Sequence, residues 1–152
     1  MKRHAFGVIA ATLAAPYIGA VIFCAFIEGK LILEGKPITF LGVRDGIINL
    51  ENITWEIYFL GTFGLLKYGI TIFIVSLAAA LIMGGRAVKA PAFVISAYTF
   101  IGFCFGSHIL ASFAQTPWWL LPSFMITGAI SGWIYWRIAL CPPADAGARK
   151  RS

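Results

Sequence analysis

The chain has 152 residues, of which 60% are hydrophobic and only 12% are charged. A soluble domain of this size could not shield so much apolar surface from water, so the composition indicates an integral membrane protein. The formal net charge of +6 could suggest nucleic-acid binding. The charges instead flank long apolar segments, which excludes nucleic acid as the expected partner.

Four apolar segments can be marked, each close to the roughly 20 residues that cross about 30 Å of hydrocarbon. They cover residues 5–27, 57–83, 91–113 and 118–140. We expect residues 1–141 to form one all-α membrane domain, a four-transmembrane-helix bundle. Residues 142–152 form a basic tail that we expect to be disordered.

The first apolar segment follows Lys2 and Arg3, and a charged start before an apolar stretch is also typical of a signal peptide. The apolar run continues to Ile27, however, and the bulky Phe23 before Cys24 fits a lipoprotein cleavage site poorly. We therefore expect this segment to remain as the first spanning helix.

The lysine and arginine residues divide unequally between the two sides of such a bundle. Eight belong to the side of the chain ends and the second connection: Lys2, Arg3, Arg86, Lys89, Arg137, Arg149, Lys150 and Arg151. Three belong to the first connection: Lys30, Lys36 and Arg44. Because these residues accumulate on the cytoplasmic side, the bias predicts a multi-pass protein of the cell inner membrane with both termini in the cytoplasm.

The first connection, residues 28–56, is the only sizeable piece predicted outside the membrane. Its runs Leu31-Ile32-Leu33 and Ile38-Thr39-Phe40 flank a turn-like stretch, Glu34-Gly35-Lys36-Pro37. This pattern favours a short β-hairpin, and Arg44-Asp45-Gly46 predicts a second turn. The many apolar residues of this loop suggest that it packs on the bundle or on a partner.

The three cysteines, Cys24, Cys104 and Cys141, are expected to be free thiols. At about 1.5 Å rise per residue, Cys24 and Cys104 would differ in depth by roughly 9 Å, more than a disulfide spans. Their spacing does not fit a metal site, so we expect no metal and no cofactor.

Two pairs of glycines have the spacing of small-residue ridges. Gly102 and Gly106 lie in the third segment, and Gly128 and Gly132 lie in the fourth. Such ridges let helix backbones approach closely, and the short connection between these segments favours an antiparallel pair within one chain. Homodimerisation through the same glycines is the alternative.

Lys67 is a charged residue well inside the second apolar segment, which makes it a candidate functional residue because a charge there is costly. Gly64 and Thr71 share its helical face, and Glu56 lies about three turns away on nearly the same face. This small and polar face is expected to turn toward the bundle interior. His108 of the third segment can reach a similar depth, so we expect a polar intramembrane cluster of Lys67, Glu56, His108 and Thr71.

The sequence contains no complete catalytic set, and we therefore expect no catalytic residue and no enzyme activity. We expect a non-catalytic accessory or assembly subunit of a larger membrane complex, in contact with membrane lipids and a membrane-protein partner or a second copy. In that case Lys67 serves packing, by snorkelling or by pairing with Glu56 or with a carboxylate of the first connection. The main alternative is a small oligomeric transporter or channel that uses Lys67, Glu56 and His108, and a membrane enzyme acting on lipid or quinone is a third possibility.

Overall fold

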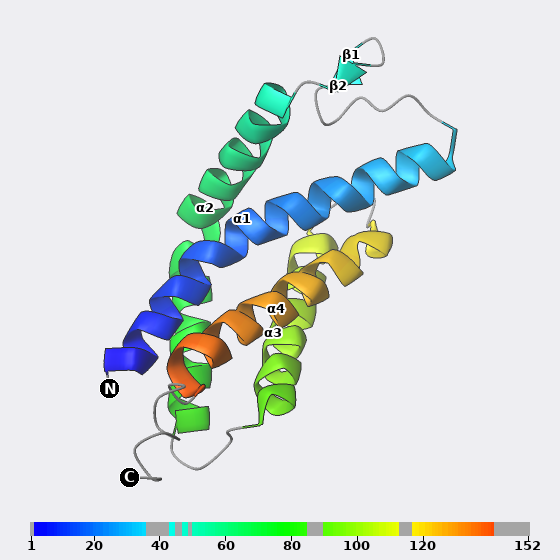
Figure 1. Ribbon diagram of the computed structural model, residues 1–152. Helices are drawn as coiled ribbons and strands as arrows, with labels where there is room; N and C mark the ends of the chain where they lie inside the picture. The colour runs from blue at the N-terminus through cyan, green and yellow to red at the C-terminus, as the bar shows by residue number, and fades with distance from the viewer. Residues whose placement is uncertain are drawn as a thin grey trace, which may run out of the picture.

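The computed structural model describes residues 2–35, 43–44, 47–48, 50–84, 90–112 and 117–141. Its four α-helices are α1 (Lys2–Leu33), α2 (Leu50–Gly84), α3 (Pro91–Ala111) and α4 (Leu121–Tyr135) (Figure 1). The 3-10 turn η1 (Trp118–Leu120) precedes α4, and the π-helical turn η2 (Trp136–Leu140) extends it. Helical residues therefore run without a break from 118 to 140, and the expected four-helix architecture is confirmed.

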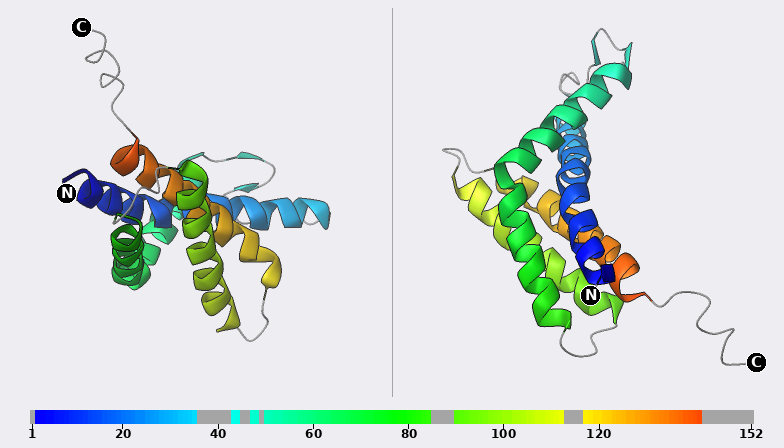
Figure 2. Two further views of the ribbon diagram at one scale, coloured as in Figure 1. Left: turned by 90° about the horizontal axis from the view of Figure 1, so that it is seen from below. Right: turned by 90° about the vertical axis from the view of Figure 1, so that its left-hand side faces the viewer.

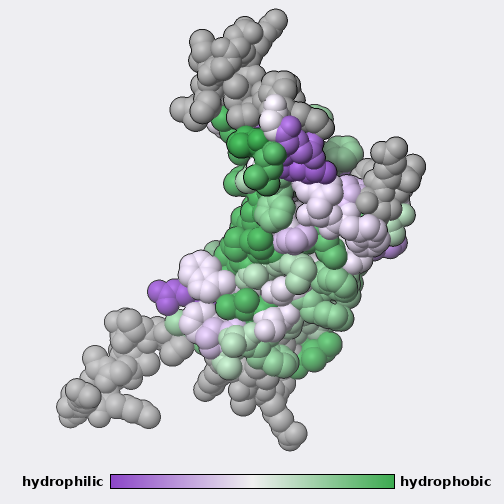
Figure 3. All heavy atoms as spheres, turned by 90° about the vertical axis from the view of Figure 1, so that its right-hand side faces the viewer, coloured by the Kyte–Doolittle hydropathy of each residue, from purple (hydrophilic) through white to green (hydrophobic). Residues whose placement is uncertain are grey.

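Among the described residues, three helical stretches are long and apolar enough to cross a membrane: Arg3–Leu33, Ile53–Ile82 and Pro91–Ala111. The expected fourth span, residues 118–140, is not one of these three. The face shown in Figure 3 is largely hydrophobic or near neutral, with strongly hydrophilic residues confined to small areas. This surface is what a chain embedded in lipid requires, since hydrocarbon rather than water surrounds it.

α1 and α2 continue beyond the predicted boundaries and shorten the first connection. Residues 28–33 and 50–56, expected in the loop, are helical. Nothing in the sequence from Glu28 to Leu33 breaks a helix, and Lys30 Nζ lies 3.6 Å from a carboxylate oxygen of Glu34, an i, i+4 pair that supports the last turn.

The hairpin expected over residues 31–40 is wrong. Leu31-Ile32-Leu33 form the last turn of α1, and Gly35 follows with a φ of 64°, the left-handed conformation that commonly ends helices. Ile38-Thr39-Phe40 lie outside the described residues, as does the tail 142–152. A smaller antiparallel pair joins β1 (Val43–Arg44) to β2 (Ile47–Ile48), but two residues in each strand do not make the predicted hairpin.

The helices pack side by side in the order α3, α4, α1 and α2, with little contact between α2 and α3 to close the bundle. α3 lies against α4, α1 packs on both α4 and α2, and α2 has little contact with α3 (Figure 2). All four helical runs meet in one core cluster: Val8, Ala11, Ala80, Val94, Tyr98, Tyr135 and Ala139.

This core lies at the end of the bundle where α1 begins and η2 finishes, which we call the terminal end. There Arg3 Nη2 donates a hydrogen bond to the carbonyl of Cys141 at 2.7 Å, and His4 Nδ1 lies 3.0 Å from the hydroxyl of Tyr135. The described chain therefore enters and leaves the bundle on the same side.

Gly102 and Gly128 bring the backbones of α3 and α4 together. A Cβ on Gly128 would overlap the carbonyl oxygen of Tyr98 and lie 3.3 Å from Cα of Gly102. A Cβ on Gly102 would in turn overlap the carbonyl oxygen of Phe124. The side chains of Phe124 and Tyr98 fill the space at Gly106 and Gly132. The two glycine ridges therefore pack against each other within one chain, as their spacing predicts.

Candidate functional site

α2 meets α1 at a crossing built on small residues. The ring of Tyr17 lies over Gly61 so closely that a Cβ there would overlap it, and Pro16 packs beside Gly64. The hydroxyl of Tyr17 lies 3.2 Å from Oγ1 of Thr62, and either oxygen can donate this hydrogen bond. The crossing fixes which side of α2 is turned toward α1.

The other side of α2 is open. Only 11% of the residues in the most apolar stretch of α2 are buried, against 33% for α1 and 22% for α3. The open side carries large apolar side chains along much of its length: Phe59, Phe63, Leu66, Ile70, Ile74, Leu77 and Leu81. We call this side the exposed face of α2.

Lys67 lies on the exposed face, at the midpoint of the apolar stretch Ile53–Ile82. Its Nζ atom is 5.2 Å from the centroid of the Tyr68 ring and 5.8 Å from that of Phe63, both within cation–π range. Among the described residues no carboxylate forms an ion pair with Lys67. The lysine is therefore held by aromatic rings on the outside of the bundle.

The expectation that Lys67 faces the interior is wrong for this chain. Gly64 does lie on the same helical face and packs beside Pro16, but Lys67 and Thr71 are both exposed. Helical spacing predicts which residues share a face, whereas the position of Tyr17 over Gly61 decides which face is covered.

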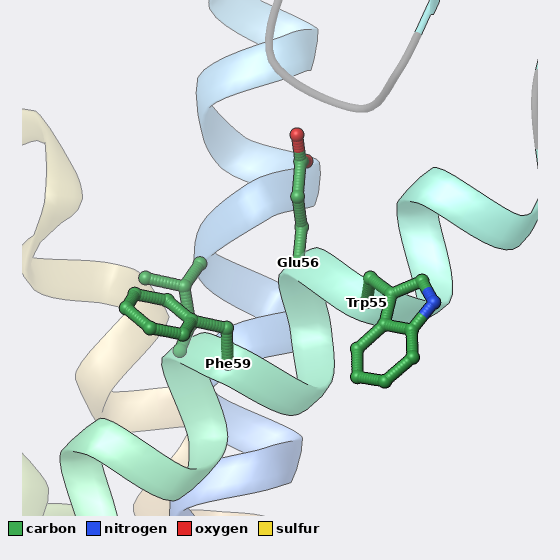
Figure 4. Close-up of a pocket in the computed structure, with 4 residues that line it drawn as sticks. Trp55, Glu56 and Phe59 are labelled. Atoms are coloured by element: carbon green, nitrogen blue, oxygen red, sulfur yellow. The ribbon is translucent and has the colours of Figure 1, made fainter.

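Glu56 turns to α1 rather than to Lys67. It is partly buried, and its Oε2 atom is buried with no hydrogen-bond donor from the described part of the chain. Glu56 lines a shallow groove with Trp55 and Phe59, and α1 passes behind these residues in Figure 4. Its position places a carboxylate between two helices at the end of the bundle far from the terminal end.

Glu28 of α1 is the neighbour of Glu56, and sequence reasoning placed it in a loop. Like charges on Glu28 and Glu56 would repel each other, and the buried Cys24 lies one turn before Glu28 in α1. Glu28 itself is buried, with 8% of its surface exposed. The available signal was that no proline interrupts the chain between Ile27 and Leu33, so the first helix can continue beyond the predicted boundary.

His108 lies on α3 and is exposed, and its backbone carbonyl accepts a hydrogen bond from Ser112 Oγ at 3.1 Å. α2 and α3 are linked instead by an edge-to-face contact of Tyr68 with Phe105, whose ring centroids are 5.3 Å apart. In the described structure Lys67 and His108 are therefore exposed on different helices, while Glu56 turns to α1.

The residues predicted as a polar cluster, together with Glu28, thus belong to separate polar features, of which two could carry a function. One is a cation at mid-span on an exposed helix face, and the other is a pair of acids between α1 and α2 that can hold a proton or a cation. Within the described ranges no three His, Cys, Asp or Glu residues form a group that could hold a metal ion, and all three cysteines are free. No protein-family model, no curated protein and no solved structure matches this chain.

Proposed function

We propose that the chain is a non-catalytic accessory or assembly subunit of a larger membrane complex and that it docks through the exposed face of α2. One observation carries the proposal, namely that Lys67 is exposed at the midpoint of a spanning helix. A charge facing lipid at the centre of a helix costs about 2.5–3.5 kcal/mol on insertion scales. A protein partner that covers this face and supplies polar contacts to the ammonium would offset that cost.

The packing of α2 supports the same role. α2 packs mainly on α1 and has little contact with α3, so its exposed face is available to another protein. The crossing at Gly61 and Thr62 holds that side in a defined orientation, so a partner would meet a rigid surface.

Purification from native membranes in a mild detergent tests this role. We expect a second membrane protein to copurify in fixed proportion, identified by mass spectrometry. A chain that runs alone, as a monomer, after extraction from membranes where it is produced at its natural level would contradict the proposal.

We further propose that the chain lies in the cell inner membrane with both ends in the cytoplasm. The excess of lysine and arginine near the chain ends supports this orientation. Labelling of Cys141 with a charged maleimide tests it, because Arg3 and Cys141 share the terminal end. Reaction from the extracytoplasmic side alone would reverse the assignment.

A small transporter or channel is the second candidate, and the buried Oε2 of Glu56 beside Glu28 favours it. In liposomes this function predicts a cation or proton flux that Glu56→Gln abolishes. The control is Glu34→Gln, because Glu34 is exposed at the end of α1 and pairs with Lys30. Absence of flux from the intact chain would leave the subunit role as the better account.

A further inference from the structure

We propose that the partner covering α2 presents a carboxylate to Lys67, supplied by an Asp or Glu near the middle of one of the partner's own spanning helices. This inference rests on the proposed docking role and adds the chemistry of the partner. It follows from the depth of Lys67 and from the positions of the acidic residues in this chain.

The depth of Lys67 excludes a lipid headgroup as its counter-charge. Lys67 is fourteen residues from Ile53 and fifteen from Ile82, the two ends of the apolar stretch. When this stretch, about 45 Å long, is centred on a hydrocarbon layer about 30 Å thick, the backbone of Lys67 lies about 15 Å from either interface. The four-carbon stem reaches only about one helical turn, roughly 5 Å, so snorkelling leaves the ammonium within hydrocarbon.

The contacts of Lys67 with other described residues leave its hydrogen bonds unfilled. The rings of Phe63 and Tyr68 attract the positive charge, but an ammonium also has three N–H donors that need acceptors. Glu56, the nearest acid along α2, lies eleven residues away, or about 16 Å along the helix. It also turns to α1, where Glu28 lies.

A second copy of this chain cannot supply the missing carboxylate. The six acidic residues of the sequence are Glu28, Glu34, Asp45, Glu51, Glu56 and Asp145. None lies between Glu56 and Asp145, the part of the chain that holds most of α2 and all of α3 and α4. A copy that crosses the membrane in the same direction would instead place its own Lys67 opposite Lys67, and like charges repel.

The surroundings of Lys67 suit a buried ion pair. Leu66 and Ile70 are exposed beside it, with 80% and 77% of their surfaces accessible, so a docked helix would enclose the charges in apolar side chains. In such surroundings an ion pair depends on both partners, and removing one leaves an uncompensated buried charge. Association should therefore be far more sensitive to Lys67 than to its apolar neighbours.

Zero-length crosslinking tests the proposal directly. A lipid-soluble carbodiimide in native membranes activates carboxylates, and an amine in contact with one displaces the activated group to form an amide. We expect mass spectrometry to find Lys67 joined to an Asp or Glu within a spanning helix of another protein. In Lys67→Arg, which keeps the charge, the partner should still copurify but this crosslink should be absent.

Copurification of variants gives an independent test. We expect Lys67→Met to lower the recovered partner at least about tenfold, which corresponds to about 1.4 kcal/mol, whereas Lys67→Arg and Leu66→Ala retain most of it. Unfolding of each variant alone in detergent checks that the bundle is intact.

The outcomes separate the two proposals. If the unaltered chain copurifies with a partner and Lys67→Met does so equally well, this inference is overturned while the docking role stands. A crosslink from Lys67 to a second copy of this chain, or none at all while a partner is present, also overturns it. If the unaltered chain has no partner, the docking role itself fails.

Discussion

Replacing Gly128 by alanine tests how closely α3 and α4 must approach. The added Cβ would overlap the carbonyl oxygen of Tyr98, lie 3.0 Å from its carbonyl carbon and lie 3.3 Å from Cα of Gly102. These neighbours are backbone atoms, which cannot turn aside as a flexible side chain can. The two helices must therefore move apart locally.

The size of the effect follows from the geometry. Ordinary contacts between carbon atoms are about 3.5–4.0 Å, so relief requires a separation of roughly 0.5–1 Å, which forfeits a quarter to a half of each contact energy. If roughly 25 atom pairs at 0.1–0.2 kcal/mol are affected, about half the contacts of a buried leucine, the cost is about 1–2 kcal/mol. Overpacked cores typically lose 1–3 kcal/mol, which agrees with this value.

Gly29→Ala is the matched control, because a Cβ at Gly29 would meet nothing within 4 Å. Both substitutions replace a helical glycine and gain the same roughly 0.5–1 kcal/mol of backbone stabilisation. The difference between them therefore isolates the close approach of α3 and α4. Unfolding in mixed micelles with rising SDS fraction, followed by circular dichroism, measures that difference.

We expect Gly128→Ala to be less stable than Gly29→Ala by about 1–2 kcal/mol. In the double variant, Gly102→Ala should lower the stability by less than it does alone, because Gly128→Ala has already separated the helices at the same point. Equal stability of the two single variants would refute the reasoning, since it would mean that the backbones are not in contact at Gly128.

Two further predictions use the same preparation. Tyr17→Phe removes the hydrogen bond to Thr62 and should lower stability by about 0.6 kcal/mol, the mean for such bonds in a membrane protein. A double-mutant cycle with Thr62→Val should give a coupling energy of the same size. Strict additivity of the two substitutions would show that the bond contributes nothing. In thiol labelling, the buried Cys24 should stay unreactive until the protein unfolds. The exposed Cys104 should react with a lipid-soluble reagent, and Cys141 should react with a charged one. Labelling of Cys24 in the folded protein would contradict its burial.

Most of the helical architecture could be predicted from composition and the lengths of the apolar runs. In hydrocarbon every backbone polar group must be satisfied within its own segment, so an apolar run of about 20 residues has little alternative to a helix. The packing of Gly102 against Gly128 was likewise predictable, because spacing along a helix defines a small ridge and a short connection limits which helix meets it.

The predicted hairpin is wrong because α1 continues through the residues expected to form its first strand. The run Leu31-Ile32-Leu33 is apolar, as a strand can be, but it directly continues a helix that is already formed. Extending a helix costs far less than starting a new element. That extension also carries Glu28 into the helix, beside Glu56.

The amino-acid sequence established that a lysine lies in the middle of a spanning helix, together with the residues that share its face. It could not establish which way that face turns, because the orientation of α2 depends on which of its residues pack against the other helices. The contact of Tyr17 with Gly61 orients α2, and the weak packing of α2 on α3 leaves Lys67 exposed. The charge of Lys67 and its position along α2 follow from the sequence, whereas its exposure depends on whether a neighbouring helix covers that face.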